Sequence, residues 1–363
     1  AELLTHRPCV CVGGSHGKST TTAMLVHILE HANRSNFGYM IGARIPGKLP
    51  ARLGDPETDF VMEACEAHQA LNVWQPNIAV LTSLGNDHSP HYGGEIQLKE
   101  TFLRFLNRVT SDGSIVVNSQ ALQTLDVTST FRNRALTFGF DLNSRLRAEP
   151  ALAQPHVFLD GDLIGKLRLS VPGDHNQLNA LAAIGAALSM GVEADTAFDA
   201  LATFKGIERR LQDVTRNEGP RIYDDFAHHP TEVHAGISSV RSSASGRVFV
   251  VMQPQLHSRI SKMAEPMASA LAQADGCFIL PVASEGETVT DCSGNDALAL
   301  ALSSQSCESQ YLNDTSEVCA ALSAAQIARS DSIIVMGGQS LEGLADEIAD
   351  YFDDQCRALS VQE

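Results

Sequence analysis

Short apolar runs alternate with longer amphipathic stretches along most of this chain. Residues 8–12 form a valine-rich apolar run, and residues 19–32 repeat apolar side chains at helical spacing. The first pattern predicts a buried strand and the second predicts a helix. The Gly-rich segment at residues 13–17 predicts a tight turn between them.

The same alternation continues through the chain. We expect strands at residues 59–64, 77–84 and 114–118, antiparallel strands at 134–140 and 156–171, and helices at 97–109, 176–192 and 194–204. Near Lys205 the pattern restarts, with strands at 221–226, 247–254, 276–282 and 331–338 and a helix from about Thr231 to Ser242. Such alternation predicts an α/β protein with mainly parallel sheets.

A chain of 363 residues has a suitable length for two domains. We expect residues 1–204 to form a P-loop-containing, parallel-sheet ATPase domain with a small antiparallel addition. Residues 205–363 would form a smaller, Rossmann-like α/β domain.

Composition narrows the classes of partner. The formal net charge of −17 argues against nucleic acid and against an anionic membrane. No apolar run approaches the roughly 20 residues that span a bilayer. The eight cysteines include no C-x-x-C pair and no signal peptide is visible, so we expect reduced thiols in a cytoplasmic protein. The chain starts at Ala1 rather than at methionine, so the natural N-terminus can lie further upstream.

The turn before the first helix has the composition of a phosphate-binding loop. A full-length loop of this kind would need glycine where the chain has Val12, so the pattern from Gly14 to Ser19 is a shortened one. Backbone N–H groups and the helix dipole would attract phosphate, and Lys18 would add positive charge. A hydroxyl of Ser19 or Thr20 could reach Mg²⁺. The alternative is an ordinary Gly-rich turn between strand and helix.

Polar side chains follow two of the expected strands. They are Glu63 and Glu66 after the first of these strands, and Asp87, His88 and His91 after the second. Ligands of open α/β sheets collect at the carboxyl ends of the strands. A carboxylate, an imidazole and a loop hydroxyl that meet there would hold Mg²⁺ with phosphate oxygens. The alternative is that these polar residues cap helices.

Three later clusters also admit two interpretations. Asn176 and Asn179 stand at a helix start, where they are either caps or contacts to a nucleotide base. The adjacent Arg209 and Arg210 are either a solvated pair or a phosphate contact. Four more residues, Asp224, Asp225, His228 and His229, precede Pro230, and a helix entry at the proline explains only part of that cluster.

Seven motifs in order resemble those of the Mur ligases: GGSHGKSTTTAM, EACEA, NDHSPHYGG, PGDHNQLNALAAI, GIERRLQ, YDDFAHHPTEV and QPQLHSR. The resemblance runs from about residue 3 to the C-terminus, and this family has the short loop G-[TS]-x-G-K-[TS]. It implies an ATP- and Mg²⁺-dependent ligase of peptidoglycan precursor synthesis that forms an amide bond through an acyl phosphate. The partners would be UDP-N-acetylmuramate and an amino acid or short peptide, in a monomer or homodimer.

Within the family, the branch that uses L-alanine resembles this chain most. The alternative is the branch that recycles the murein tripeptide L-alanyl-γ-D-glutamyl-meso-diaminopimelate. Two further possibilities are a folylpolyglutamate- or cyanophycin-type ligase and a nucleotide-binding relative that no longer ligates.

The resemblance also implies roles for individual residues. The nucleotide phosphates would contact the loop residues Gly14, Ser15, His16, Gly17, Lys18, Ser19 and Thr20. Ser19 or Thr20 would bind one Mg²⁺, and Glu63 with His88 a second. Asn176, with Asn179 nearby, would contact adenine, while Arg210 or Arg209 would reach the phosphates and Asp225 or Asp224 the ribose. The amino-acid substrate would meet His229, Gln255 and Arg259, and the catalytic set would be Lys18, Glu63, His88 and Arg210.

Three departures from the family pattern stand out. The N-terminal domain that binds the UDP-sugar in the family is absent from this chain. Cys65 occupies a position where the family usually has an acid, and Leu256 replaces an arginine that is expected to help grip the amino acid's carboxylate. The change at Leu256 leaves Arg259 as the arginine retained in that motif.

Overall fold

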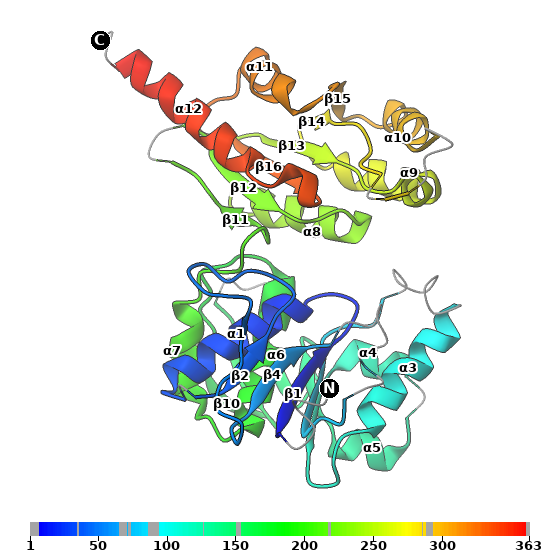
Figure 1. Ribbon diagram of the computed structural model, residues 1–363, viewed down its shortest axis with the longest axis vertical. Helices are drawn as coiled ribbons and strands as arrows, with labels where there is room; N and C mark the ends of the chain where they lie inside the picture. Colours follow the sequence, from blue (N-terminus) through cyan, green and yellow to red (C-terminus); the bar gives the residue numbers. More distant parts are fainter. Residues whose placement is uncertain are drawn as a thin grey trace. The chain divides into compact units, whose positions relative to one another are not determined.

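The computed structural model describes residues 7–34, 36–64, 71, 74–85, 94–125, 127–149, 154–216, 219–284, 286–287 and 293–360. The chain divides into two compact units, residues 1–207 and 208–363 (Figure 1). Ile207 is buried in the core of the first unit and Leu211 in a core of the second, so the chain passes from one core to another within a few residues.

A ten-stranded sheet with the order β10-β9-β8-β7-β6-β5-β1-β4-β2-β3 forms the centre of the first unit. Its strands are β1 (Cys9–Gly13), β2 (Gly38–Met40), β3 (Ala51–Arg52), β4 (Phe60–Glu63), β5 (Ile78–Leu81), β6 (Ser114–Asn118), β7 (Leu136–Gly139), β8 (Leu146–Ala148), β9 (His156–Leu159) and β10 (Asp162–Lys166). From β2 to β8 every neighbouring pair is parallel, whereas β3, β9 and β10 are joined antiparallel.

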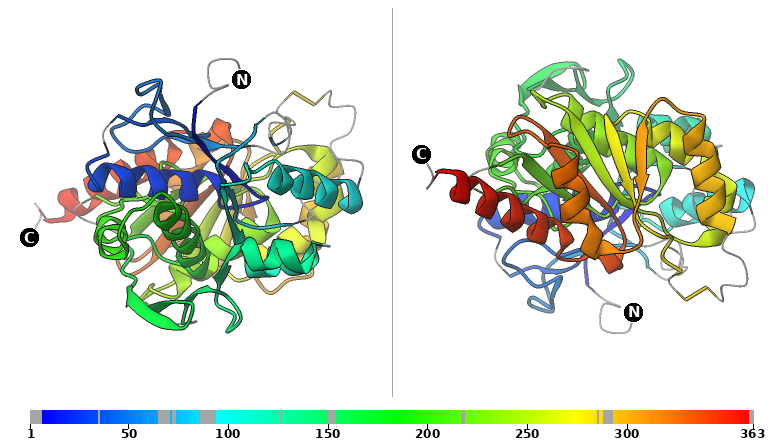
Figure 2. Two further views of the ribbon diagram at one scale, coloured as in Figure 1. Left: turned by 90° about the horizontal axis from the view of Figure 1, so that it is seen from below. Right: turned by 90° about the horizontal axis from the view of Figure 1, so that it is seen from above.

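Helices cover both faces of this sheet. One face carries α1 (Lys18–His31), α6 (Asp174–Ser189) and α7 (Ala194–Ala202), and the other carries α3 (Glu95–Asn107), α4 (Ser119–Thr124) and α5 (Ser129–Arg134). Figure 2 shows the blue helix α1 beside the green helices α6 and α7, with the cyan helix α3 apart from them. Successive side chains of β1 point to opposite faces, so Val10 and Val12 join one core while Cys9 and Cys11 join the other.

The small antiparallel addition is confirmed at β9 and β10, which a turn at Asp160 and Gly161 joins. Both turn residues have positive φ, 52° and 96°, which is the backbone of a tight hairpin. The antiparallel prediction for residues 134–140 is wrong, because β7 pairs parallel with β6 and β8. The short helices α4 and α5 make a crossover after β6, and such a connection returns the chain in the same direction.

The second unit has a six-stranded sheet with the order β11-β12-β16-β13-β14-β15. Its strands are β11 (Gln212–Asp213), β12 (Arg221–Asp225), β13 (Val248–Gln253), β14 (Gly276–Ile279), β15 (Glu308–Tyr311) and β16 (Ser332–Gly337). All neighbours are parallel except β11 and β12.

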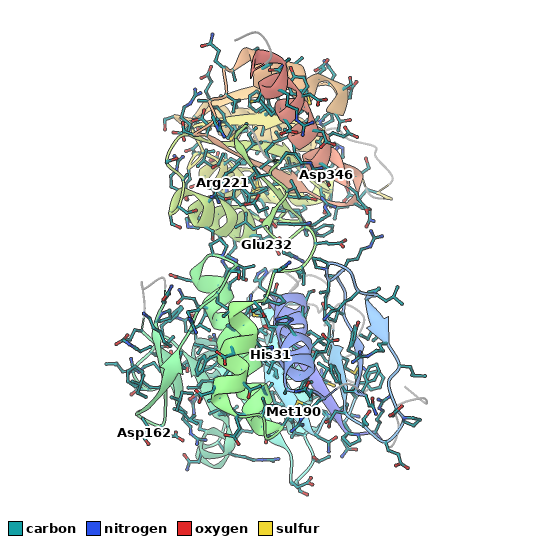
Figure 3. All side chains as sticks on the ribbon, turned by 90° about the vertical axis from the view of Figure 1, so that its left-hand side faces the viewer. His31, Asp162, Met190, Arg221, Glu232 and Asp346 are labelled. Carbon is teal, nitrogen blue, oxygen red and sulfur yellow. The ribbon has the colours of Figure 1, made fainter. Side chains whose placement is uncertain are left out.

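Helices also cover both faces of the second sheet. One face packs against α8 (Pro230–Arg241), α9 (His257–Leu271) and α10 (Ser293–Ser303), and the other against α11 (Val318–Ala324) and α12 (Leu344–Ser360). Side chains fill the space between sheet and helices in each unit (Figure 3). These two sandwiches confirm the predicted α/β fold. Within the described residues, no helix combines the length and the apolar character that crossing a bilayer requires.

Candidate functional site

The Gly-rich loop connects β1 to the start of α1. Gly17, the residue before the helix, has φ 83°, and no side chain caps the helix there. Gly14 has φ 139°, so both glycines adopt backbone conformations that other residues avoid. The Lys18 ammonium folds back over the loop and donates to the carbonyls of Gly14 at 2.6 Å and Ser15 at 3.1 Å. The loop therefore combines a helix N-terminus with a lysine, which is the arrangement that binds phosphate.

Residues just after β5 hold this loop in shape. The backbone N–H of His16 donates to Ser83 Oγ at 2.8 Å, and Thr82 Oγ1 donates to the His16 carbonyl at 2.5 Å. The Ser15 hydroxyl also accepts from the Gly85 N–H at 2.8 Å. No local sequence pattern predicts this support, because Thr82 and Ser83 meet the loop only after β5 has paired with β1.

Glu63, at the end of β4, faces the same loop. Its Oε2 accepts a hydrogen bond from Ser19 Oγ at 2.8 Å and another from the Gly42 N–H at 2.8 Å. A hydroxyl and a carboxylate oxygen are ligands that suit Mg²⁺, so these two residues fit the predicted metal. His88, together with Glu66, Asp87 and His91, lies outside the described residues. Among the described residues, no group of three or more His, Cys, Asp or Glu could hold a metal ion.

The two asparagines of α6 lie beside the loop and are nearly buried. Asn176 Nδ2 donates to the Pro172 carbonyl at 2.7 Å, and Asn179 Nδ2 donates to Asn176 Oδ1 at 3.4 Å. Thr21 of α1 donates to Asn179 Oδ1 at 3.4 Å. A Cβ atom on Gly17 would lie 2.2 Å from that same oxygen. Asn179 therefore packs directly against the residue at which α1 begins.

In the second unit, the two adjacent arginines have different environments. Arg209 donates to the Asp224 carboxylate at 3.2 Å and to the carbonyls of Gly338 and Gly337 at 2.8 and 3.0 Å. Its side chain is 14% exposed, whereas that of Arg210 is 37% exposed. Arg210 is thus the arginine whose guanidinium is open to a ligand.

The backbone around Arg210 is unusual. Arg209 and Leu211, on either side of it, both have positive φ, 55° and 49°. Residues without glycine's freedom seldom adopt this conformation, and it recurs at functional sites. The Phe226 N–H donates to the Arg209 carbonyl at 2.7 Å, which ties this strained segment to the end of β12.

The two aspartates that end β12 point to opposite faces of the strand. Asp224 pairs with Arg209, and burial raises the pKa of its carboxyl while Arg209 opposes the rise. Asp225 accepts from the Ala227 N–H at 3.3 Å. Burial raises the pKa of Asp225 to about 7, with Arg210 opposing and Glu232 reinforcing this shift.

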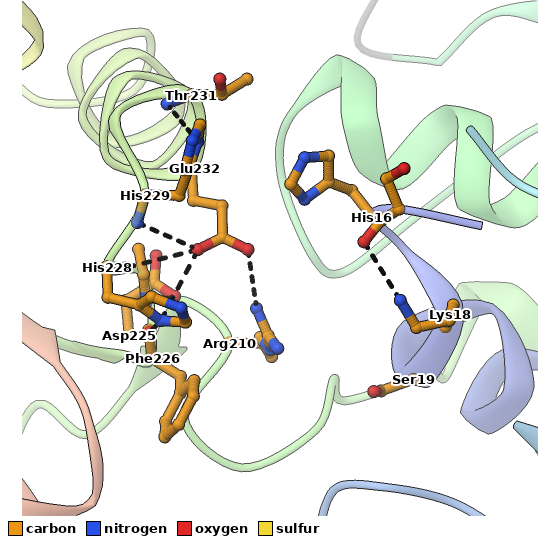
Figure 4. Close-up of polar contacts among 12 residues, drawn as sticks. His16, Lys18, Ser19, Arg210, Asp225, Phe226, His228, His229, Thr231 and Glu232 are labelled. Carbon is orange, nitrogen blue, oxygen red and sulfur yellow. Dashed lines mark hydrogen bonds and ion pairs between the residues drawn. The ribbon is translucent and has the colours of Figure 1, made fainter. Parts of the chain in front are cut away.

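The helix α8 begins with a capping box. His229 is the N-cap, its Nδ1 accepts from the Thr231 N–H at 3.3 Å, and Pro230 follows at the first helical position. Glu232 reaches back, and its Oε2 accepts from the backbone N–H groups of His228 and His229, both at 3.3 Å (Figure 4). The helix entry predicted at Pro230 is confirmed. Glu232 belongs to this helix entry, because a glutamate three residues after a cap is a recognised signal of a capping box.

Three buried nitrogens gather where α9 begins. Gln255 Nε2, His257 Nδ1 and Arg259 Nη1 have no hydrogen-bond partner in the part of the chain that the structure describes. An unsatisfied buried polar group costs about 1–3 kcal/mol, so three in one motif make the start of α9 a candidate ligand site. Leu256, between the first two, has φ 63°. His257 is an addition to the residues expected from the sequence.

Comparison with known proteins gives consistent matches to both units. The model of the Mur ligase middle domain matches residues 12–187, and that of the Mur ligase, glutamate ligase domain matches residues 209–358. The UDP-N-acetylmuramate–L-alanine ligase of Syntrophomonas wolfei subsp. wolfei is 32% identical over 347 residues, which cover 93% of this chain and 74% of that protein. The enzyme of the same name from Mycobacterium marinum is 35% identical over 373 residues, with coverage of 96% and 74%.

A solved structure also resembles the whole chain. The crystal structure of UDP-N-acetylmuramate-alanine ligase from Thermotoga maritima has a TM-score of 0.79 at 22% identity, and the match covers 98% of this chain and 77% of that one. At this level of identity the likeness concerns the fold.

Proposed function

The chain belongs to the Mur ligase family of ATP-dependent amide ligases in peptidoglycan precursor synthesis, and on this premise we propose that it joins L-alanine to UDP-N-acetylmuramate in the cytoplasm. The observation that carries the proposal is the identity of 32% and 35% to relatives named for that activity, over most of this chain. In this reaction ATP would phosphorylate the muramoyl carboxylate. The amine would then attack the acyl phosphate, and phosphate would leave as the amide bond forms.

The Gly-rich loop would hold the ATP phosphates. Lys18, which bonds loop carbonyls at 2.6 and 3.1 Å, would turn toward the β- and γ-phosphates and neutralise their charge. Ser19 and Glu63, whose oxygens are 2.8 Å apart, would hold Mg²⁺, with Thr20 as the other hydroxyl candidate and His88 as a further ligand. Mg²⁺, when bound, would neutralise charge on phosphate oxygens.

Hydrogen bonding supports our assignment of the remaining nucleotide contacts, and for the two arginines exposure supports it as well. We assign the phosphate contact to Arg210, because Arg209 is committed to Asp224 and two carbonyls. By the same reasoning Asp225, rather than the paired Asp224, would contact the ribose. Asn176 would present its carboxamide to adenine, and Asn179 would support both Asn176 and the loop.

The amino-acid substrate would bind where α9 begins. Its carboxylate can accept from Arg259 Nη1 and Gln255 Nε2, two buried donors that lack a partner among the described residues. A charge-assisted hydrogen bond of this kind is worth about 1.5–3 kcal/mol. His229 would lie on the amine side of the same substrate.

The experiment that tests the proposal is steady-state ligation by the full-length protein with L-alanine, L-serine, glycine and the murein tripeptide in turn. Arg259→Ala should raise the KM of the preferred amine by about 10- to 150-fold, since about 1.4 kcal/mol is a factor of ten. The KM of ATP should hardly change. Arg216→Ala, which removes an arginine bound at the surface to Asp346 and Asp350, is the matched control and should change neither constant.

Two results would count against this assignment. An unchanged amine KM in Arg259→Ala would remove α9 from the acceptor site. Efficient ligation of the tripeptide alone would favour the recycling ligase instead. Leu256 supports that alternative, because it replaces an arginine expected in the L-alanine branch.

A further inference from the structure

Glu232 contacts both of the second unit's motifs that we assign to the nucleotide. Its Oε2 accepts from the backbone N–H groups of His228 and His229, both at 3.3 Å, and lies 3.8 Å from His228 Nδ1. Its Oε1 lies 3.7 Å from Arg210 Nη1. The two oxygens of one carboxylate thus serve two partners, the start of α8 and the side chain of Arg210 (Figure 4).

A helix start alone does not require the second of these contacts. A capping box needs one oxygen that accepts from the N-cap backbone, and either glutamate or glutamine provides it. The charge on Oε1 is therefore available for Arg210. Because Oε2 is fixed by two backbone donors and the side chain is only 21% exposed, the carboxylate presents Oε1 from a defined position.

The backbone of Arg210 is equally well defined. Arg209 and Leu211, on either side of it, have positive φ, and the Phe226 N–H donates to the Arg209 carbonyl at 2.7 Å, which holds this backbone to the end of β12. The guanidinium carbon also lies 5.6 Å from the centre of the Phe226 ring, which contributes a weaker attraction. A long side chain anchored at its backbone still has several rotatable bonds, and the ion pair with Glu232 restricts them.

We infer that Glu232 is a positioning residue, which acts through Arg210 and sets the orientation of its guanidinium for the reacting phosphate. This inference rests on the proposed ligase function and on the assignment of Arg210 to the phosphates. Orientation matters because a displacement of about 1 Å in a positioning group can lower the rate by about 10²-fold.

The test is a double-mutant cycle with Glu232→Gln and Arg210→Ala. The glutamine keeps an oxygen for the capping box but replaces the charge that faces Arg210 with a neutral amide. We expect Glu232→Gln to lower kcat about 10-fold, which is within the range expected for a displaced guanidinium. The amine KM and the midpoint of urea unfolding should not change. In the Arg210→Ala background the same substitution should have no further effect, because the group through which it acts is gone.

Glu317→Gln is the matched control. Glu317 also serves a helix start, but both of its oxygens bind Asn313, from the backbone at 2.9 Å and from the side chain at 2.8 Å. This variant should leave kcat unchanged. The inference is overturned if Glu232→Gln leaves kcat unchanged or raises it, or if it lowers kcat by the same factor with and without Arg210.

A binding measurement separates this inference from the ligase proposal. If the unsubstituted protein ligates no amine, the proposed function is wrong. The double-mutant cycle of Glu232→Gln and Arg210→Ala can still be measured through the dissociation constant of ATP. Calorimetry should then show weaker binding in Glu232→Gln only when Arg210 is present. Equal weakening in both backgrounds would contradict a role through Arg210.

Discussion

At the scale of single residues, the buried carboxyl of Asp225 has a strongly raised pKa. It lies at the end of β12, accepts a hydrogen bond from the Ala227 N–H at 3.3 Å and is only 7% exposed. Burial disfavours the charged form of a carboxyl, and here its effect exceeds the opposing attraction of Arg210. Folding and protonation of this one side chain are therefore linked.

We predict that Asp225 makes the stability of the protein depend on pH. Its pKa is about 7 in the folded protein and about 3.9 in an unfolded chain, so the protonated form stabilises the fold. That contribution is complete below about pH 4, decreases as the pH rises and is lost above about pH 7, for a total of about 4 kcal/mol. Urea unfolding of the nucleotide-free protein at several pH values measures it.

Asp225→Asn isolates this contribution, because the amide has nearly the same shape and does not titrate. The other titratable groups are common to both proteins, so the difference between their pH profiles reports Asp225 together with its effect on the charged neighbours Arg210 and Glu232. Parallel profiles for the two proteins would mean that the pKa of Asp225 is the same in the folded and the unfolded chain.

The adjacent arginines show why a sequence motif cannot assign every role. The pattern GIERRLQ marked both Arg209 and Arg210 as candidates, and the residue type is identical. What distinguishes them is that Asp224 and the carbonyls of Gly337 and Gly338 surround Arg209. Those partners are far away in the sequence or on another strand, so the distinction exists only in the folded chain.

At the scale of elements, the junction between the Gly-rich loop and α1 is closely packed. Gly17 combines a left-handed backbone, φ 83°, with a close neighbour on another helix, Asn179. Thr21, one turn into α1, bonds that same asparagine. The start of α1 is thus fixed to α6 through one side chain.

We predict that Gly17→Ala disturbs this junction more than its backbone strain alone explains. The left-handed conformation costs an alanine about 1–2 kcal/mol. In addition, the new Cβ would lie 2.2 Å from Asn179 Oδ1, so the asparagine must move away from Thr21 and Asn176. Urea unfolding should show a loss above about 2 kcal/mol, and phosphate binding should weaken with it.

Gly47→Ala provides the comparison. Gly47 has φ 74°, and a Cβ there would meet no atom within 4 Å. It therefore measures the backbone contribution without a clash. Equal losses of stability in the two variants would show that contact with Asn179 has no effect on the junction.

The sequence predicts well those elements whose own hydrophobic pattern determines their secondary structure. The valine-rich strand and the apolar helix that follow the N-terminus form β1 and α1, because each pattern reports burial directly. By contrast β3 has two residues and β2 has three, too few to show a period. The direction of β7 was missed because it depends on the short crossover helices α4 and α5, which the pattern did not reveal.

At the scale of the molecule, each unit has its own hydrophobic cores on both faces of its own sheet. In the first unit α1 and α6 pack on each other and on their sheet, and in the second unit α9 and α12 cover opposite faces of the sheet. Along the chain, Phe204 and Ile207 are the last residues in the core of the first unit, and Leu211 is the first residue in a core of the second. A domain needs such a core in order to fold alone.

We predict that residues 208–363 fold as an independent fragment with a single cooperative urea transition. We also predict that residues 1–207 are more stable than residues 1–204, because the shorter fragment lacks the buried Ile207. Burying such a side chain contributes about 1.5–3 kcal/mol. Circular dichroism during urea titration measures both. Equal stability of the two N-terminal fragments would place the boundary at 204 rather than 207.

The outermost strands of both sheets have a consequence for how the protein behaves when concentrated. An open sheet exposes unpaired backbone at its edges, where a strand of another molecule can add and start a fibril. Here β3 and β11 are two residues long, β15 is four residues long and begins with the exposed charge of Glu308, and β10 carries exposed charges at Asp162 and Lys166. Two short edges and two charged edges leave little flat backbone for a second chain to extend. The large sheet therefore contains many strands without offering a ready template for aggregation.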